Sequence, residues 1–171
     1  LVMLKRLFSL LTLTSLMLVL PVHATPLLQA VAANDLAAVQ NILQNPAQAG
    51  LLEVRDELGR TPLLLATDHN RIAIARALIA AGANVNAKDS RQDSPYLLAG
   101  AQGRLEILKM TLAHGADLGS TNRYGGTALI PAAERGHVAV VRTLIDAGVK
   151  VDHVNRCLLY TSDAADDLLC V

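Results

Sequence analysis

Short blocks of apolar residues alternate with polar and glycine-containing segments along most of this chain. In residues 56–88, two blocks carry apolar side chains three and four residues apart, which is the spacing of one helix face. Thr61 and Pro62 suit the start of the first helix, and Asn70 and Gly82 suit the left-handed ends of the two helices. The pattern predicts a turn, a helix, a short loop, a second helix and a long loop. The apolar positions are Leu63, Leu64, Ala66, Ile72, Ile74, Ala75, Leu78 and Ile79.

The same pattern returns at a fixed step of 33 residues. A phrase around Thr-Pro-Leu occupies residues 59–66 and recurs at 92–99 and 125–132. A second phrase, Ala-Gly-Ala-Asn-Val-Asn at 81–86, returns in related form at 114–118 and 147–152 with the same step. Two phrases in phase indicate stacked copies of one small unit, each burying its apolar face against its neighbours. We therefore expect a chain built to present an extended surface.

These phrases resemble the ankyrin repeat, whose pattern runs Asp-x-x-Gly-x-Thr-Pro-Leu-His-x-Ala, then Gly-His, Leu-Leu and Gly-Ala-Asp-Val-Asn. The resemblance implies an all-α solenoid of helix-turn-helix units with projecting β-hairpin-like loops. It covers residues 25–155 and divides them into an N-terminal cap-like repeat and three regular units, at 25–55, 56–88, 89–121 and 122–154. The departures are Leu64, Leu97 and Ile130 in place of the family histidine, Gln92 in place of a turn glycine, and Pro131 in a first helical turn.

The first unit is a looser copy of the others. Its polar residues Gln29, Asn34 and Asp35, assigned to its first helix, indicate a unit whose open side faces water, as the caps of repeat stacks do. Residues 45–52 make a longer connection to the next unit.

Residues 1–24 have the pattern of a secretory signal peptide. Lys5 and Arg6 precede an apolar run at 7–20, and Val22 and Ala24 supply the small residues of a cleavage site. The alternative is an uncleaved anchor, but a helix that spans a bilayer needs about 20 apolar residues. We expect cleavage after Ala24 and export, to the periplasm if the source is a Gram-negative bacterium.

Residues 157–171 break the register of the repeats. They resemble the translated sequence of a sequencing-library adapter, so we expect a non-native tail; the alternative is a genuine short acidic tail. Both cysteines, Cys157 and Cys170, lie in it. If the stack is cut at residue 155, the last unit should expose an apolar face that includes Leu129, Val138 and Val141.

Composition argues against several classes of function. The chain carries 15 basic and 15 acidic residues, so a clustered basic face for nucleic acid is not expected. His69, His114, His137 and His153 form no close pair of metal-ligand spacing. No phosphate-binding loop or nucleophile elbow is present. We expect no catalytic site, no metal and no cofactor, and hence no enzyme within these residues.

The ankyrin resemblance implies a monomer that binds a protein partner, of unknown identity, through a concave face made of loop tips and first-helix ends. After signal cleavage no contact with a membrane is expected. Two alternatives remain, namely an inhibitor or immunity-type protein that covers a partner enzyme, and the non-catalytic part of a longer enzyme. Arginine and tyrosine are frequent in binding hot spots, so Arg91, Arg123, Tyr124 and Arg135 are the preferred contacts. The full predicted set is Glu57, Leu58, Arg60, Asp68, His69, Arg91, Asp93, Gln102, Arg123, Tyr124, Glu134 and Arg135.

Overall fold

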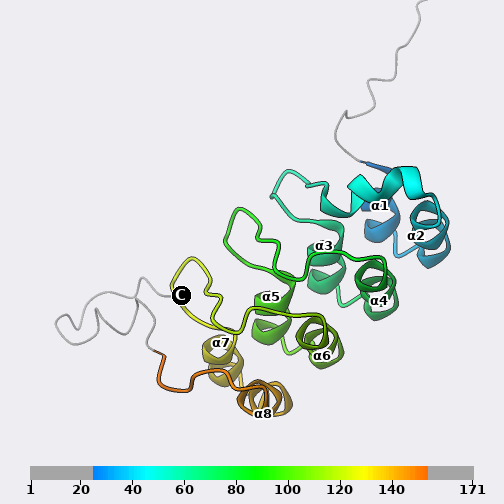
Figure 1. The fold of residues 1–171 in the computed structure, drawn as a ribbon. Helices are drawn as coiled ribbons and strands as arrows, with labels where there is room; N and C mark the ends of the chain where they lie inside the picture. Colours follow the sequence, from blue (N-terminus) through cyan, green and yellow to red (C-terminus); the bar gives the residue numbers. More distant parts are fainter. Residues whose placement is uncertain (1–24, 154–171) are drawn as a thin grey trace, which may run out of the picture.

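The computed structural model describes residues 25–153, and these residues form a stack of four helix pairs (Figure 1). A 3₁₀ helix, η1 (Pro46–Glu53), follows the first pair, and no strand occurs between residues 25 and 153. The predicted all-α, helix-turn-helix solenoid is confirmed. The pairs are α1 (Pro26–Ala32) with α2 (Leu36–Leu43), α3 (Pro62–Asp68) with α4 (Ile72–Ala80), α5 (Pro95–Ala101) with α6 (Leu105–Ala113), and α7 (Leu129–Glu134) with α8 (Val138–Asp146).

The helices stand in two rows, with α1, α3, α5 and α7 in one row and α2, α4, α6 and α8 in the other (Figure 1). Each helix contacts its pair partner and the next helix of its own row. Long loops project from the row of first helices. The apolar positions predicted for each unit lie between the rows, where Leu63, Leu78, Ile107, Leu108 and Leu144 are fully buried. Burial along the whole stack makes one continuous core.

The first helices of the second and third units begin as their sequences predict. The Thr61 hydroxyl accepts a hydrogen bond from the Leu64 N–H at 3.3 Å, and the Ser94 hydroxyl accepts one from the Leu97 N–H at 3.2 Å. Each is followed by a proline in the first helical turn. Asn70 and Gln92 adopt the left-handed conformation expected of glycine, with φ of 54° and 65°.

Three loops between units are closed by the same set of bonds. The Asp56 N–H donates to the Arg60 carbonyl at 3.1 Å, and the Asp56 carboxylate accepts from the N–H groups of Leu58 and Arg60. Asp89 and Asn122 repeat this arrangement in the next two loops. The loops therefore turn back like hairpins without containing strands, and they hold equivalent tip residues in equivalent places.

Neighbouring loops are also joined to one another. Ser90 donates from its N–H and its hydroxyl to the Leu58 carbonyl, at 3.2 and 2.6 Å. The Arg55 guanidinium reaches the Lys88 carbonyl at 2.6 Å, and the Lys88 ammonium reaches the Thr121 carbonyl at 2.8 Å, each one unit further along the stack. These bonds between adjacent units fix the spacing of the loop tips.

Some predicted details are wrong. The predicted exposure of Leu129 is wrong, because Leu129 faces the core at the start of α7 and only 8% of its surface is exposed. Val138, from the same predicted face, is 68% exposed as predicted, and Val141 is half-buried. Asn34 and Asp35 do not lie on the first helix, since Asn34 forms the left-handed turn after α1 and Asp35 caps α2 by accepting from the Ala38 N–H. The longer connection predicted at 45–52 is present, and most of it forms the 3₁₀ helix η1.

The predicted signal peptide at 1–24 and the predicted non-native tail at 157–171 lie outside the described residues. Within residues 25–153, no helix combines the length and the apolar character needed to cross a bilayer.

Candidate functional site

A groove of about 390 Å³ lies between the loops of the three regular units and the row of first helices. The loops supply one wall, the ends of α3, α5 and α7 supply the other, and faces of α5 and α7 contribute to the floor. Ten of the predicted contact residues line it: Leu58, Arg60, Asp68, Arg91, Asp93, Gln102, Arg123, Tyr124, Glu134 and Arg135.

Two of the predicted contact residues lie outside the groove, and several residues that line the groove were not predicted. Glu57 is exposed at a loop tip and His69 is exposed at the end of α3, and neither lines the groove. The prediction covered loop tips and helix ends only, whereas the floor is formed by side chains from the faces of α5 and α7. Their signal was present in the register, since Leu98 and Pro131 stand one and two steps after Leu65. The additional lining residues are Asp89, Leu98, Asn122, Gly126, Ile130 and Pro131.

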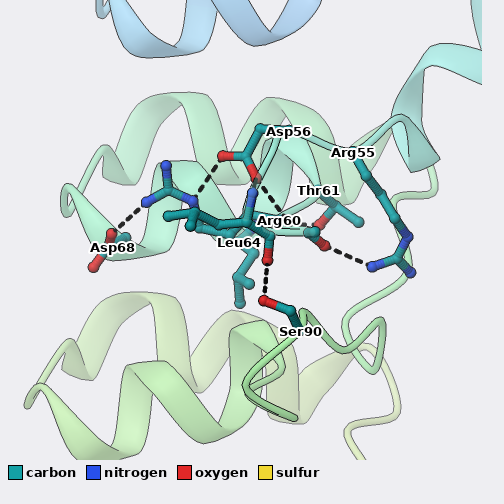
Figure 2. Close-up of polar contacts among 9 residues, drawn as sticks. Arg55, Asp56, Arg60, Thr61, Leu64, Asp68 and Ser90 are labelled. Carbon is teal, nitrogen blue, oxygen red and sulfur yellow. Dashed lines mark hydrogen bonds and ion pairs between the residues drawn. The ribbon is translucent and has the colours of Figure 1, made fainter. Parts of the chain in front are cut away.

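Three of the predicted contacts hold one another. The Arg60 Nε lies 2.7 Å from Asp56 Oδ2, and its Nη1 lies 2.9 Å from Asp68 Oδ2 (Figure 2). The other oxygen of Asp68 accepts from Gln102 Nε2 at 2.9 Å, which joins α3 to the next unit. Because these side chains satisfy each other, their main effect is to shape this end of the groove.

Asp56 shows the electrostatic effect of that arrangement. Burial acts to raise the pKa of its carboxyl, but the main-chain N–H and guanidinium of Arg60 and the N–H of Leu58 hold the pKa below its usual value. The carboxylate is therefore ionised at neutral pH and keeps both the loop and Arg60 in place.

The third unit replaces this arginine by Asp93. Burial raises the pKa of the Asp93 carboxyl, and the neighbouring Asp89 raises it further, while the charges of Arg91, Arg123 and Lys88 oppose the shift. The nearest guanidinium atom, Arg91 Nε, is 3.8 Å from Asp93 Oδ2. Asp89 itself is buried and uses its Oδ1 for the N–H groups of its own loop. The middle of the groove thus holds a weakly compensated carboxyl.

Exposed apolar and cationic groups stand at the loop tips. Leu58 is 52% exposed and Tyr124 is 37% exposed, and the two occupy equivalent positions on either side of Arg91. The Arg123 guanidinium lies over the Tyr124 ring, 4.7 Å from its centre. At the opposite wall, Arg135 Nη1 donates to the Ala101 carbonyl at 2.6 Å. A concave surface with large exposed side chains of these kinds is suited to non-covalent recognition.

The histidines occupy separate places. His114 Nδ1 is 2.8 Å from the Met110 carbonyl, and His153 Nε2 is 2.6 Å from the Gly125 carbonyl. The ring of His137 packs directly over Gly103. Among the described residues, no group of three or more histidine, cysteine, aspartate or glutamate side chains is placed to hold a metal ion.

Comparison with known families decides the classification. The family described as ankyrin repeats (many copies) matches residues 96–145, and that described as ankyrin repeats (3 copies) matches residues 5–89. The chain belongs to the ankyrin-repeat family. Ankyrin repeats are generally protein–protein interaction modules and are typically non-catalytic.

Solved structures resemble this ankyrin-repeat protein closely. An ankyrin repeat domain from Acinetobacter baumannii AYE, solved at 1.00 Å resolution, is 62% identical over 77% of this chain, with a TM-score of 0.73. A second ankyrin repeat protein is 47% identical over 76% of this chain, with a TM-score of 0.71. The chain spans 65% of the length of each of these two proteins. No curated protein matches it.

Proposed function

We propose that this ankyrin-repeat protein is exported and binds a protein partner in the groove. The observation that carries the proposal is the groove itself, where large exposed side chains from successive units line up along one concave face. Arg91, Arg123 and Tyr124 are residue types that dominate binding energy when a partner covers them.

The regularity of the stack supports a partner that lies along the groove. The first two loop tips are joined by the hydrogen bond from Ser90 to the Leu58 carbonyl, and Lys88 bonds the Thr121 carbonyl at the base of the third loop. A surface held at fixed spacing loses little conformational freedom on binding, so more of the contact energy appears as affinity. Cationic and anionic side chains both line the groove, which favours a complementary, specific partner over a general polyelectrolyte.

The binding site is tested by matched alanine variants. Tagged protein recovers partners from periplasmic extract of the source bacterium, the partners are identified by mass spectrometry, and a purified partner is titrated by calorimetry. Replacing Arg91, Tyr124 and Arg135 together by alanine should weaken binding by at least about 2 kcal/mol, the scale of a hot spot.

The control variant carries Lys109→Ala and Arg142→Ala, on α6 and α8 in the other row of helices. It should bind as the unmodified protein does. Equal affinity after the groove substitutions, or a larger loss in the control, would place the interface on the opposite side of the stack.

Export is supported by the charged pair, apolar run and small residues within positions 1–24. Intact mass measurement of protein from a host that exports it should give a chain beginning at Thr25. A product that retains the apolar run at 7–20 would indicate an anchored protein instead.

A further inference from the structure

The polar side chains in the groove divide into those engaged within the molecule and those free to bind. Asp68 is held by Arg60 and Gln102, at 2.9 Å each. Asp89 accepts two N–H groups of its own loop. The charged side chains of Arg60, Asp68 and Asp89 therefore have partners within the protein and are not available to bind a ligand.

The free groups are mainly guanidinium groups. The Arg91 side chain is 61% exposed, and within residues 25–153 its closest carboxylate oxygen is the one on Asp93, 3.8 Å away. Arg123 is exposed and rests on the Tyr124 ring without an ion pair to any described residue. Arg135 is exposed and donates to one main-chain carbonyl. Each of the three keeps N–H groups that no described side chain accepts.

Fewer carboxylates are free to balance these cations. Glu134 is exposed and forms no hydrogen bond or ion pair with any described residue. Asp93 is mostly buried, with 18% of its side chain exposed, and its surroundings disfavour its charge. Counting only unengaged groups, the third and fourth units therefore present an excess of positive charge beside the exposed ring of Tyr124.

We infer that the partner segment is acidic, with one or more carboxylates facing Arg91, Arg123 and Arg135 and an aromatic or aliphatic side chain against Tyr124 and Leu58. This inference rests on the proposed function. A guanidinium can give a carboxylate two parallel hydrogen bonds, which adds both energy and orientation. Nucleic acid fits less well, because its regularly repeated phosphates would also meet the exposed Glu134 carboxylate in the same groove.

A library of random dodecapeptides displayed on phage provides a probe that does not depend on knowing the partner. Selection against the full-length protein should enrich peptides with aspartate or glutamate next to tyrosine, phenylalanine or leucine. A selected peptide should bind at least about tenfold more tightly than its asparagine and glutamine counterpart, a factor that corresponds to one charge-assisted contact.

Charge reversal tests whether Arg91 and Arg123 bind the acidic side chains of the peptide. In the Arg91→Glu, Arg123→Glu variant, the selected acidic peptide should lose about tenfold or more in affinity, and a new selection should favour lysine and arginine. The matched control, Arg76→Glu with Arg142→Glu, changes exposed arginines on α4 and α8 and should stay within about twofold of the unmodified protein. Circular dichroism confirms that each variant is folded.

Each remaining outcome overturns the inference in a recognisable way. Selected peptides without acidic enrichment, whose binding is lost on Tyr124→Ala, would leave the groove as the binding site and remove the acidic partner. Peptides affected only by the control substitutions would contradict the groove as well. Displacement of the acidic peptide by a twelve-nucleotide oligothymidylate at similar concentration would show a general polyanion site.

Discussion

At the level of single residues, equivalent positions of successive units carry different chemistry on the same backbone. The position of Arg60 is taken by Asp93 and then by Gly126. Arg60 makes two short ion pairs within its unit, at 2.7 and 2.9 Å, whereas Asp93 has only the 3.8 Å contact with Arg91. The loop bonds that precede this position are the same in all three units. The backbone repeat therefore sets where a side chain stands, and substitution within the repeat determines what it binds.

The limits of sequence-based prediction are also visible at this scale. Thr61, Ser94 and Thr127 share one position of the repeat, so the register extends the helix start predicted at Thr61 to the other two. Two of them cap their helices, but α7 begins at Leu129, one residue later in its unit, and the Thr127 hydroxyl is buried without a partner among the described residues. The fourth unit has Ala128 where the others have proline. Proline presets the φ angle of a first helical residue. The repeat register shows that this proline is missing from the fourth unit, but it does not show by how many residues the start of the helix shifts.

Tyr96 gives a prediction with a pH signature. Its hydroxyl is fully buried without a partner among residues 25–153, and burial, with a smaller effect of the Asp117 charge, raises the pKa of Tyr96 to about 12. The unfolded chain ionises near the ordinary pKa of about 10. Stability from this group is thus complete below pH 10 and is lost as pH rises toward 12, by about 1.4 kcal/mol per pH unit.

The variant Tyr96→Phe has no such group. At pH 7 its free energy of unfolding should equal or exceed that of the unmodified protein, because an unpaired buried hydroxyl costs about 1–3 kcal/mol. Urea unfolding followed by circular dichroism at pH 7, 10 and 11.5 makes the comparison. Parallel pH dependence of the two proteins above pH 10 would show that the pKa of Tyr96 is not raised, and hence that water reaches its hydroxyl in solution.

At the level of elements, every helix from α1 to α8 is too short to persist alone in water, where helices below about 12 residues are marginal. Contact with neighbours therefore supplies their stability. The sequence predicted these helices well, because glycine and asparagine mark their ends and the apolar spacing marks their faces. It did not predict η1, whose residues show neither helical nor alternating apolar spacing. It also could not predict the bond from Gln102 to Asp68, which joins residues 34 positions apart through side-chain geometry.

Gly100 tests how closely two first helices approach. A Cβ on this α5 residue would lie 2.7 Å from the Cβ of Ala128 and 3.2 Å from its carbonyl oxygen. Helix propensity alone would favour alanine by roughly 0.5–1 kcal/mol. We expect Gly100→Ala instead to lower the free energy of unfolding by about 1–3 kcal/mol, since α5 and α7 would have to separate.

Two controls accompany that variant in chemical unfolding. Gly50→Ala adds a methyl group where no atom lies within 4 Å and should be close to neutral. Combining Gly100→Ala with Ala128→Gly removes the closest contact and should recover part of the loss. Stabilisation by Gly100→Ala alone would mean that the α5–α7 interface adjusts without cost.

At the level of the whole molecule, the candidate site follows from the stacking of units. Residues one repeat apart in the sequence lie in a row along the stack. The register was therefore sufficient to predict ten residues that line the same groove. The register could not predict which of these side chains lack a partner within the protein. Such pairing depends on distances between side-chain atoms, for example the 2.9 Å between Arg60 Nη1 and Asp68 Oδ2. Stacking also determines stability. The free energy of unfolding is the sum of a contribution from each unit and a contribution from each interface between adjacent units.

Protection from hydrogen exchange should therefore differ along the stack. Helix α4 packs against α2, α3 and α6, and its Ile79 is buried. Helix α8 packs against α6 and α7, and its equivalent residue, Ile145, is 47% exposed, with Val138 at 68%. Fewer buried contacts lower the free energy of local opening. We expect the amides of α8 to exchange at least about tenfold faster than those of α4, a difference near 1.4 kcal/mol.

Exchange at neutral pH followed by mass spectrometry on peptides from α4 and α8 measures this difference in protection directly, with α6 as an internal reference flanked on both sides. Equal protection of α4, α6 and α8 would show that the stack opens as a single cooperative unit, and the sum of neighbouring interfaces would then be the wrong description of its stability.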